Sequence, residues 1–323
     1  MPKILITGAA GFIGQLLAER LLSEPQYQLI LTDVIEPPIP SRAKNSSNVR
    51  SIKADLCDMK SLNDLISSSL PLDAIFIFHG IMSSGSEANF DLGMKVNLHA
   101  TQSLLEALRQ AKSEKLIRVI YASSQAVYGQ PLPAVIDESV MPTPEGSYGA
   151  QKLICETLIN DYTRKCFFDG LSTRFPTISI RPGKPTQAAS SFLSGMIREP
   201  IDGKECIIPL QDRSFRSWLC SPKTLAENLV YALTVDLEKL EKHKRVVNMP
   251  GIGVTVQEMM DALAKVAGED KLALLKEKTD VDMERILRSW GTEFDNKLAY
   301  KLGFREDVSF EQAVRDYISS LEK

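Results

Sequence analysis

Short apolar runs and amphipathic segments alternate along the first half of the chain. Runs with the length and composition of buried β-strands lie at 3–7, 28–33, 49–56, 73–78, 116–124 and 171–183. Segments with apolar residues at helical spacing lie at 12–23, 61–70, 90–111 and 147–162. Strands that alternate with helices in this way predict an α/β fold with a Rossmann-like, doubly wound parallel sheet.

The alternation weakens after Arg181, where the chain becomes less regular. We expect a helix, a short strand and three further helices at 190–200, 204–210, 221–233, 255–268 and 310–323. The residues expected to cap helices are Ser61, Ser221, Thr255 with Glu258 in the capping-box position, and Gly268. The second half therefore predicts a smaller C-terminal region.

A glycine loop joins the first expected strand to the first expected helix. Gly8, Gly11 and Gly14 form G-x-x-G-x-x-G, one residue longer in its first spacing than the usual dinucleotide loop. Such glycines let the backbone approach a pyrophosphate, which the N–H groups of the helix N-terminus bind. Asp33, at the end of the second strand, would accept hydrogen bonds from a ribose and repel a 2′-phosphate. The cofactor we expect is NAD; the alternative is a glycine-rich turn followed by a surface aspartate.

Composition narrows the class of protein further. The net charge of −3 and pI of about 5.8 do not favour electrostatic binding to nucleic acid or to an anionic membrane. The longest apolar stretch, at 74–78, is far shorter than the ~20 residues of a membrane span. Scattered cysteines without C-x-x-C, few histidines and no secretory signal favour a cytoplasmic protein without a metal site.

Residues suited to hydride-transfer chemistry follow the fifth strand. Tyr148 and Lys152 lie one helical turn apart, and Ser124 ends the strand before their helix. Oxidation of an alcohol needs a base for the hydroxyl proton, and a neighbouring ammonium favours the phenolate form of a tyrosine. Ser124 could hold the substrate oxygen. Taken singly, each residue could instead be a packing residue or a cap, and only their joint occurrence with the glycine loop favours catalysis.

The order of the motifs resembles that of the extended short-chain dehydrogenase/reductase superfamily, also called NAD-dependent epimerases/dehydratases. The matching stretches are "TGAAGFIG", "ADL", "KVNLHAT", "ASSQAVYG", "SYGAQK" and "RPG". The resemblance implies that Ser124, Tyr148, Lys152 and Asn97 are catalytic. It also implies a set of cofactor-binding residues, namely Gly8, Gly11, Phe12, Ile13, Gly14, Asp33, Asp55, Leu56, Tyr148, Lys152, Pro176 and Ile178. Asp55 ends the third strand, where it could contact the adenine; a helix-capping or surface aspartate is an alternative of nearly equal weight.

Within the superfamily, "RPGKP", "ASSF" and "IREP" are similar to D-erythronate dehydrogenase-like proteins, which oxidise the C2 hydroxyl of a small sugar acid. The substrate residues we expect are Ser83, Ser84, Ser124, Arg181 and Ser190, with Lys184 and Ser191 nearby. Arg181 could bind a carboxylate with two hydrogen bonds or tie the following turn. Two stretches differ from relatives in the superfamily. "HGIM" stands in place of the usual "HLAA", in a loop that lines the substrate pocket in the family. "RSWLCSPK" stands where nucleotide-sugar members often carry "RDFIHVDD", which argues against a nucleotide-sugar epimerase.

These observations predict 1–180, with 221–248 returning to it, as the NAD-binding domain. They predict 181–220 and 249–323 as the substrate-binding region. The favoured function is an NAD-dependent dehydrogenase of a small polyhydroxy acid. A nucleotide-sugar epimerase or dehydratase with tightly bound NAD is the first alternative, and a non-catalytic NAD sensor the second. The resemblance implies a homodimer formed through the helices at 90–111 and 147–162.

Overall fold

The chain forms two compact units in the computed structural model, which describes residues 1–43, 47–111, 113, 115–184 and 190–321. The first unit contains Met1–Val127, Pro144–Arg174 and Ala226–Val247, and the second contains Tyr128–Thr143, Phe175–Leu225 and Asn248–Lys323. The bounds differ from the predicted ones, most visibly because 128–143 belongs to the second unit. The predicted roles of the two regions stay predictions.

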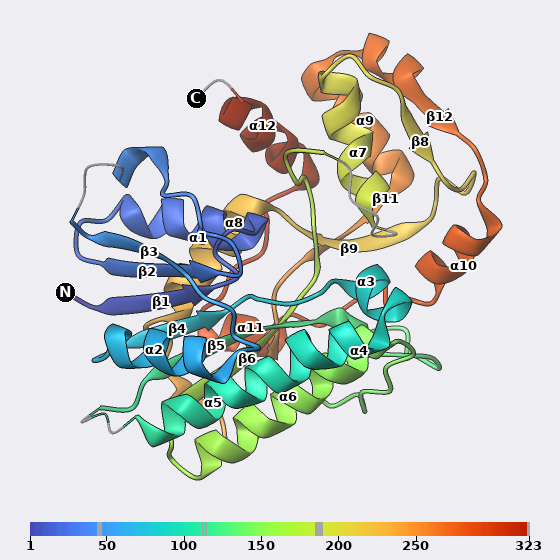
Figure 1. Ribbon diagram of the computed structural model, residues 1–323. Coiled ribbons are helices and arrows are strands. Elements are labelled where there is room, and N and C mark those ends of the chain that lie inside the picture. Colours follow the sequence, from blue (N-terminus) through green and yellow to red (C-terminus); the bar gives the residue numbers. More distant parts are fainter. Residues whose placement is uncertain (44–46, 112, 114, 185–189, 322–323) are drawn as a thin grey trace. The chain divides into compact units, whose positions relative to one another are not determined.

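A seven-stranded sheet forms the centre of the first unit (Figure 1). Its strand order is β10 (Val246–Asn248), β6 (Asp169–Phe175), β5 (Arg118–Ser124), β4 (Ala74–Ile77), β1 (Lys3–Thr7), β2 (Gln28–Asp33) and β3 (Val49–Lys53). The pairs β1–β2, β2–β3, β1–β4 and β4–β5 are parallel. The chain runs outward from β1 in both directions, so the topological switch point lies between β1 and β4. The predicted Rossmann-like, doubly wound fold is confirmed.

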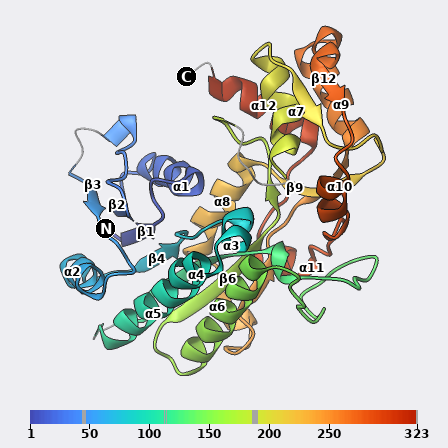
Figure 2. The same ribbon diagram turned by 45° about the vertical axis from the view of Figure 1, so that its right-hand side comes forward.

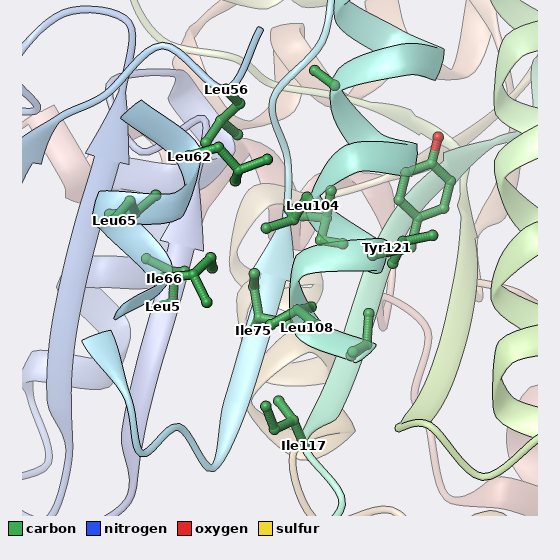
Figure 3. Packing of buried hydrophobic residues seen from close by; sticks show 14 of the residues in the cluster. Leu5, Leu56, Leu62, Leu65, Ile66, Ile75, Leu104, Leu108, Ile117 and Tyr121 are labelled. Atoms are coloured by element: carbon green, nitrogen blue, oxygen red, sulfur yellow. The ribbon is translucent and has the colours of Figure 1, made fainter. Parts of the chain in front are cut away.

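Helices cover both faces of this sheet (Figure 2). The helices on one face are α2 (Met59–Ser69), α5 (Ala100–Gln110) and α6 (Ser147–Arg164), and those on the other are α1 (Phe12–Leu22) and α8 (Pro222–Ala232). Figure 3 shows Leu62 and Ile66 of α2 and Leu104 of α5 packed over the strand residues Leu5 and Ile75. All five side chains are almost fully buried, which explains the apolar runs in the sequence.

Two predicted helix features differ in the structure. Ser61 is not the cap of α2, because the Asp58 carboxylate accepts the hydrogen bond from the Ser61 N–H at 2.7 Å. The helix therefore begins at Met59. The single helix expected at 90–111 is divided into α4 (Phe90–Gly93), a π-helical segment at Met94–His99 and α5. A short helix, α3 (Ser83–Ala88), and a 3₁₀ turn at Gln125–Val127 were not predicted.

The second unit has two small sheets and its own apolar core. One sheet orders β11 (Ile252–Thr255), β9 (Arg216–Cys220) and β7 (Thr177–Ile178), and the other pairs β8 (Cys206–Ile208) with β12 (Leu275–Glu277). The helices are α7 (Ser191–Ile201), α9 (Val256–Ala267), α10 (Val281–Arg288), α11 (Lys297–Leu302) and α12 (Phe310–Leu321). Strands β9, β11 and β12 and helices α10 and α11 were not predicted. The predicted capping box of α9 is confirmed, since Thr255 and Glu258 satisfy each other's backbone N–H groups.

All five cysteines are free thiols. Across the described part of the chain, no helix combines the length and the apolar character needed to cross a membrane.

Candidate active site

The glycine loop packs directly against the end of β4. Gly8 has φ +66°, and a Cβ at Gly8 would lie 2.6 Å from the backbone nitrogen of His79. A Cβ at Gly14 would lie 2.6 Å from the Gly8 carbonyl oxygen and from the Ala9 Cα. Real Cβ atoms do not approach this closely, so these positions require glycine. The glycine loop therefore lies against the backbone at the end of β4, at the switch point between β1 and β4.

The N-terminus of α1 fits a dinucleotide pyrophosphate. Gly11 is the N-cap, no side chain caps the first turn, and no acidic residue lies in that turn. Backbone N–H groups and the positive end of the helix dipole are thus left to an anion. Phe12 and Ile13, predicted to contact the cofactor, begin this helix. The residues present fit the predicted NAD.

Asp33 is fixed beside the glycine loop at the end of β2. Its Oδ2 accepts a hydrogen bond from the Ala10 N–H at 3.0 Å, and its Oδ1 accepts one from the Val34 N–H at 2.7 Å. The Ala10 contact ties the carboxylate to the loop that would bind the pyrophosphate. A carboxylate can accept about four hydrogen bonds, so it keeps sites for ribose hydroxyls. The predicted ribose role remains a prediction.

Asp55 and Leu56 follow β3 in the same unit. Asp55 does not cap α2, because Asp58 does; the Asp55 Oδ1 instead accepts the Cys57 N–H at 2.8 Å. The Asp55 side chain is exposed and Leu56 is buried. This position agrees with either of two roles for Asp55: a surface residue that stabilises the turn, or a contact to the adenine.

Lys152 is held by the end of β5. Its Nζ donates to the Ala122 carbonyl oxygen at 2.7 Å and lies 5.5 Å from the ring centre of Tyr148 and 4.6 Å from that of Tyr121. Burial lowers the pKa of Lys152 to about 8. The hydrogen bond to Ala122 thus holds the ammonium close to the Tyr148 ring, whose ionisation the positive charge would favour.

Helix α6, which carries Tyr148 and Lys152, approaches the end of β5 through a glycine. A Cβ at Gly149 would lie 2.0 Å from the Ala126 carbonyl oxygen, so no other residue fits here. Ser124 is the last residue of β5, and its Oγ accepts the Ala126 N–H at 3.1 Å. Tyr148 is half-buried at the start of α6. The structure thus brings Ser124, Tyr148 and Lys152 to one edge of the sheet.

Asn97 lies in the π-helical segment and organises the segment after β4. Its Oδ1 accepts the Ile81 N–H at 2.6 Å, and its Nδ2 donates to the Ile81 carbonyl oxygen at 3.0 Å. The same Nδ2 donates to the Gln151 Oε1 at 2.7 Å and to the Ser86 Oγ at 3.1 Å. Gln151 immediately precedes Lys152, so Asn97 links the active-site helix to the "HGIM" segment. Sequence reasoning missed Gln151, because 54 residues separate it from Asn97.

His79 is a second residue that sequence reasoning missed. Its Nδ1 lies 2.9 Å from the Thr7 Oγ1 and its Nε2 lies 3.2 Å from the Thr101 Oγ1. These contacts join the ends of β1 and β4 to α5. Burial, with a smaller effect of the Lys152 charge, lowers the pKa of His79 to about 3. The neutral ring therefore holds the strand end against which Gly8 packs.

The predicted substrate residues lie in both units. Ser83 and Ser84 begin α3 in the first unit. Arg181 and Ser190 belong to the second unit, as do the nearby Lys184 and Ser191. Pro176 and Ile178, which were predicted to bind the cofactor, also belong to the second unit. The Arg181 Nε donates to the Ile178 carbonyl oxygen at 2.9 Å, and its own carbonyl oxygen accepts from the Arg198 Nη1 at 2.9 Å. Arg181 thus ties its local turn, and its predicted contact with a carboxylate stays a prediction.

The fold and this arrangement define a class of enzyme, and comparison with known families agrees. The model of the NAD dependent epimerase/dehydratase family matches residues 4–248. The chain belongs to the NAD-dependent epimerase/dehydratase family, that is, to the extended short-chain dehydrogenase/reductases. The predicted family and the predicted NAD cofactor are confirmed.

Named relatives are similar over almost the whole chain. D-erythronate dehydrogenase of Haemophilus influenzae is 40% identical over 319 residues, which cover 98% of each chain. D-erythronate dehydrogenase of Cupriavidus necator is 38% identical over 326 residues, again 98% of each chain. A crystal structure described as the nucleoside-diphosphate-sugar epimerase from Agrobacterium tumefaciens is 39% identical, with a TM-score of 0.92 over 98% of this chain and 94% of that one. The family match and the two relatives named D-erythronate dehydrogenase confirm the prediction of an NAD-dependent dehydrogenase.

Proposed function

We propose that the protein oxidises the C2 hydroxyl of a small sugar acid such as D-erythronate, with NAD⁺ as the hydride acceptor. The observation that carries this proposal is the placement of Ser124, Tyr148 and Lys152. Ser124 ends β5, and Tyr148 and Lys152 lie on α6, with the Lys152 Nζ bonded to the Ala122 carbonyl oxygen of β5. Two full-length relatives named D-erythronate dehydrogenase supply the substrate class.

Each catalytic residue has a separate role in the proposed reaction. The Tyr148 phenolate takes the hydroxyl proton of the substrate, and the Lys152 ammonium stabilises that phenolate. The Ser124 hydroxyl donates a hydrogen bond to the same oxygen, which becomes a carbonyl. Bound NAD⁺ supplies the site that accepts the hydride from C2. The products are the 2-oxo acid, NADH and one proton.

Asn97 is proposed to position this machinery rather than to touch the substrate. Its contacts to Ile81 and Gln151 fix the segment after β4 relative to Lys152. Ser83 and Ser84 follow that segment and are proposed to donate hydrogen bonds to substrate oxygens. Arg181 and Ser190 are proposed to bind the carboxylate.

We also propose a cytoplasmic homodimer that acts in carbohydrate metabolism. Phe90 is 57% exposed, Leu92 41% and Ile154 42%. These residues lie on α4 and α6, within the segments that the resemblance implicates in dimer formation. Three exposed apolar side chains on these two helices suit a subunit interface. The free thiols suit a reducing compartment.

A nucleotide-sugar epimerase is the second candidate, because one solved relative at 39% identity carries that description. The two reactions differ in their cofactor balance. An epimerase returns the hydride to its substrate and forms no net NADH, whereas the proposed dehydrogenase releases NADH.

An absorbance assay at 340 nm separates these candidates. We expect net NADH with D-erythronate and with some members of a panel of four- to six-carbon aldonates and uronates. Absence of NADH with every acid, together with inversion of a UDP-hexose, would replace the proposal by the epimerase. Binding of NAD without any turnover would favour the sensor.

A further inference from the structure

Lys152 is a buried ammonium with few polar contacts. The residue is 4% exposed, and among the described residues its Nζ donates one hydrogen bond, to the Ala122 carbonyl oxygen at 2.7 Å. An ammonium can donate three. The carboxylate of Glu156, one turn further along α6, is already paired with Arg174, whose Nη2 lies 2.6 Å from its Oε2. A positive charge that is buried in this way is costly unless another group stabilises it.

The face of the Tyr121 ring lies against this ammonium. The Lys152 Nζ is 4.6 Å from the centre of the Tyr121 ring, closer than the 5.5 Å that separates it from the centre of the Tyr148 ring. A cation within about 6 Å of the centre of an aromatic ring is attracted to the negative ring face, most strongly where water is excluded. Tyr121 is 1% exposed, so this contact is shielded from water.

The place of Tyr121 on β5 keeps the ring fixed. Tyr121 and Ser123 are two residues apart on the strand, so their side chains share one face of the sheet. That face meets α6, because the Ser123 Oγ donates to Glu156. The ring packs within the buried apolar cluster of the first unit (Figure 3). Ala122 is the next residue on the strand, so β5 presents a ring face and a carbonyl oxygen to the same Lys152 ammonium.

The other titratable groups around Lys152 do not replace the ring. His79, at the end of β4, is neutral, since burial lowers its pKa to about 3. Burial raises the pKa of the Cys155 thiol on α6, so that this group is uncharged as well. Glu156 is held in its own ion pair, and Tyr148 carries a charge only as the phenolate. The aromatic ring on β5 is therefore the fixed group that stabilises the ammonium throughout.

We propose that Tyr121 is a positioning residue, whose ring face keeps the Lys152 ammonium charged and close to Tyr148. The proposed reaction needs Lys152 protonated while Tyr148 is deprotonated. Burial favours the neutral amine, and the ring opposes that effect because it attracts only the charged form. The consequence for catalysis rests on the proposed function, whereas the effect of the ring on Lys152 does not depend on the substrate.

An NMR titration of the full-length protein, labelled with ¹³C at the lysine ε-carbons, tests the contact. The signal of Lys152 is the one that disappears in Lys152→Met, and the exposed Lys165 is the internal reference. Tyr121→Phe keeps the ring and removes only the hydroxyl. A second variant carries 3,4,5-trifluorophenylalanine at position 121, which nearly keeps the shape of the ring and depletes the negative charge of its face.

We expect the pKa of Lys152 in Tyr121→Phe to stay within about 0.3 of the wild-type value, and in the fluorinated variant to fall at least ~0.5 below that of Tyr121→Phe. Tyr121→Leu, which has no ring, should lower this pKa in the same direction, and it decides if the fluorinated protein does not fold. Equal pKa values of Lys152 in Tyr121→Phe and in the ring-depleted variants would overturn the proposal.

The pH dependence of turnover connects the contact to the reaction. Loss of the Lys152 proton should lower kcat for sugar-acid oxidation at alkaline pH. The fluorinated variant should show this decline at a lower pH than Tyr121→Phe. An identical pH profile of kcat in the two variants would contradict the role of Tyr121 in catalysis. Absence of turnover in every protein would count against the dehydrogenase instead, and the NMR titration would still decide whether the ring stabilises the ammonium.

Discussion

At the scale of single residues, the proposal depends most on Tyr148. General-base catalysis typically contributes ~10²–10⁴-fold to a rate. We expect Tyr148→Phe to lower kcat for sugar-acid oxidation by at least about 10²-fold and to leave the dissociation constant of NAD⁺ within about twofold, measured by tryptophan or NADH fluorescence. Comparable losses of turnover and of NAD⁺ affinity would mean that Tyr148 acts by holding the fold or the cofactor.

Lys152 makes a prediction about stability as well as catalysis. Its pKa falls from 10.5 in the unfolded chain to about 8 in the native state, because it is buried. Between these values the unfolded chain binds the extra proton, so stability rises as the pH increases. We expect the stability of the wild type relative to Lys152→Met to rise by roughly 2–3 kcal/mol between pH 7 and pH 10 in urea unfolding.

The control for this experiment is Lys165→Met, which changes an exposed lysine just after α6. Its stability difference from the wild type should depend on pH far less. Parallel pH profiles for the wild type and Lys152→Met would show that Lys152 is not held as described.

Asp33 is the residue that should select NAD over NADP. A hydrogen bond to a charged group is worth roughly 1.5–3 kcal/mol, which is about 10- to 100-fold in affinity. We expect Asp33→Ala to lower the ratio of kcat/KM values for NAD and NADP by about that factor. Asp33→Asn keeps an acceptor for the Ala10 N–H and serves as the matched control for loop geometry. An unchanged cofactor ratio in Asp33→Ala would remove its ribose role.

At the scale of elements, the strand-loop-helix unit of β1, the glycine loop and α1 could be predicted from the sequence. The spacing of Gly8, Gly11 and Gly14 encodes close backbone approaches, and the structure shows them against His79 and Ala9. The partners of those elements could not be predicted. His79 meets Thr7 and Thr101 only because β1, β4 and α5 converge in space.

His79 allows this convergence to be tested by acid. Its pKa is about 3 in the native state and 6.5 in the unfolded chain, so acidification protonates the unfolded chain first and destabilises the protein. We expect the unfolding free energy to fall by about 2 kcal/mol between pH 7 and pH 5 through this residue. His79→Gln should lose that part of the pH dependence, whereas His243→Gln, at a 53% exposed position, should retain it. Equal pH slopes in both variants would contradict the buried, neutral ring.

Helix boundaries show a similar limit at the element scale. The apolar spacing located α2, but it suggested Ser61 as the cap, whereas the Asp58 carboxylate caps the helix by accepting the Ser61 N–H. The π-helical turn at Met94–His99 leaves the same apolar periodicity in the sequence as an ordinary helix. The π-helical segment could therefore not be predicted from the sequence; the structure shows it, with Asn97 hydrogen-bonded to Gln151.

At the scale of the whole molecule, the alternation of strands and helices was enough to predict the sheet of the first unit. The second unit was predicted less completely, because β9 and β11 are short and pair over a long sequence separation. Such strands carry little periodic signal. Ser124, Tyr148 and Lys152 could be proposed as catalytic residues from the sequence because they lie on the well-patterned elements β5 and α6. Of the other proposed substrate residues, Ser83 and Ser84 lie in α3, a helix that the apolar pattern did not predict, and Arg181 and Ser190 follow β7, where the alternation in the sequence weakens.

The measurement that tests the central claim most directly follows the hydrogen on C2 of the substrate. D-erythronate labelled with deuterium at C2 is incubated with NAD⁺ and the enzyme, and the nicotinamide product is examined by NMR spectroscopy. We expect deuterium at C4 of the reduced nicotinamide, in amounts equal to the 2-oxo acid formed, and formation of both products slowed by at least about 10²-fold in Tyr148→Phe. Reduced cofactor without deuterium, or no reduced cofactor from any sugar acid, would contradict the account.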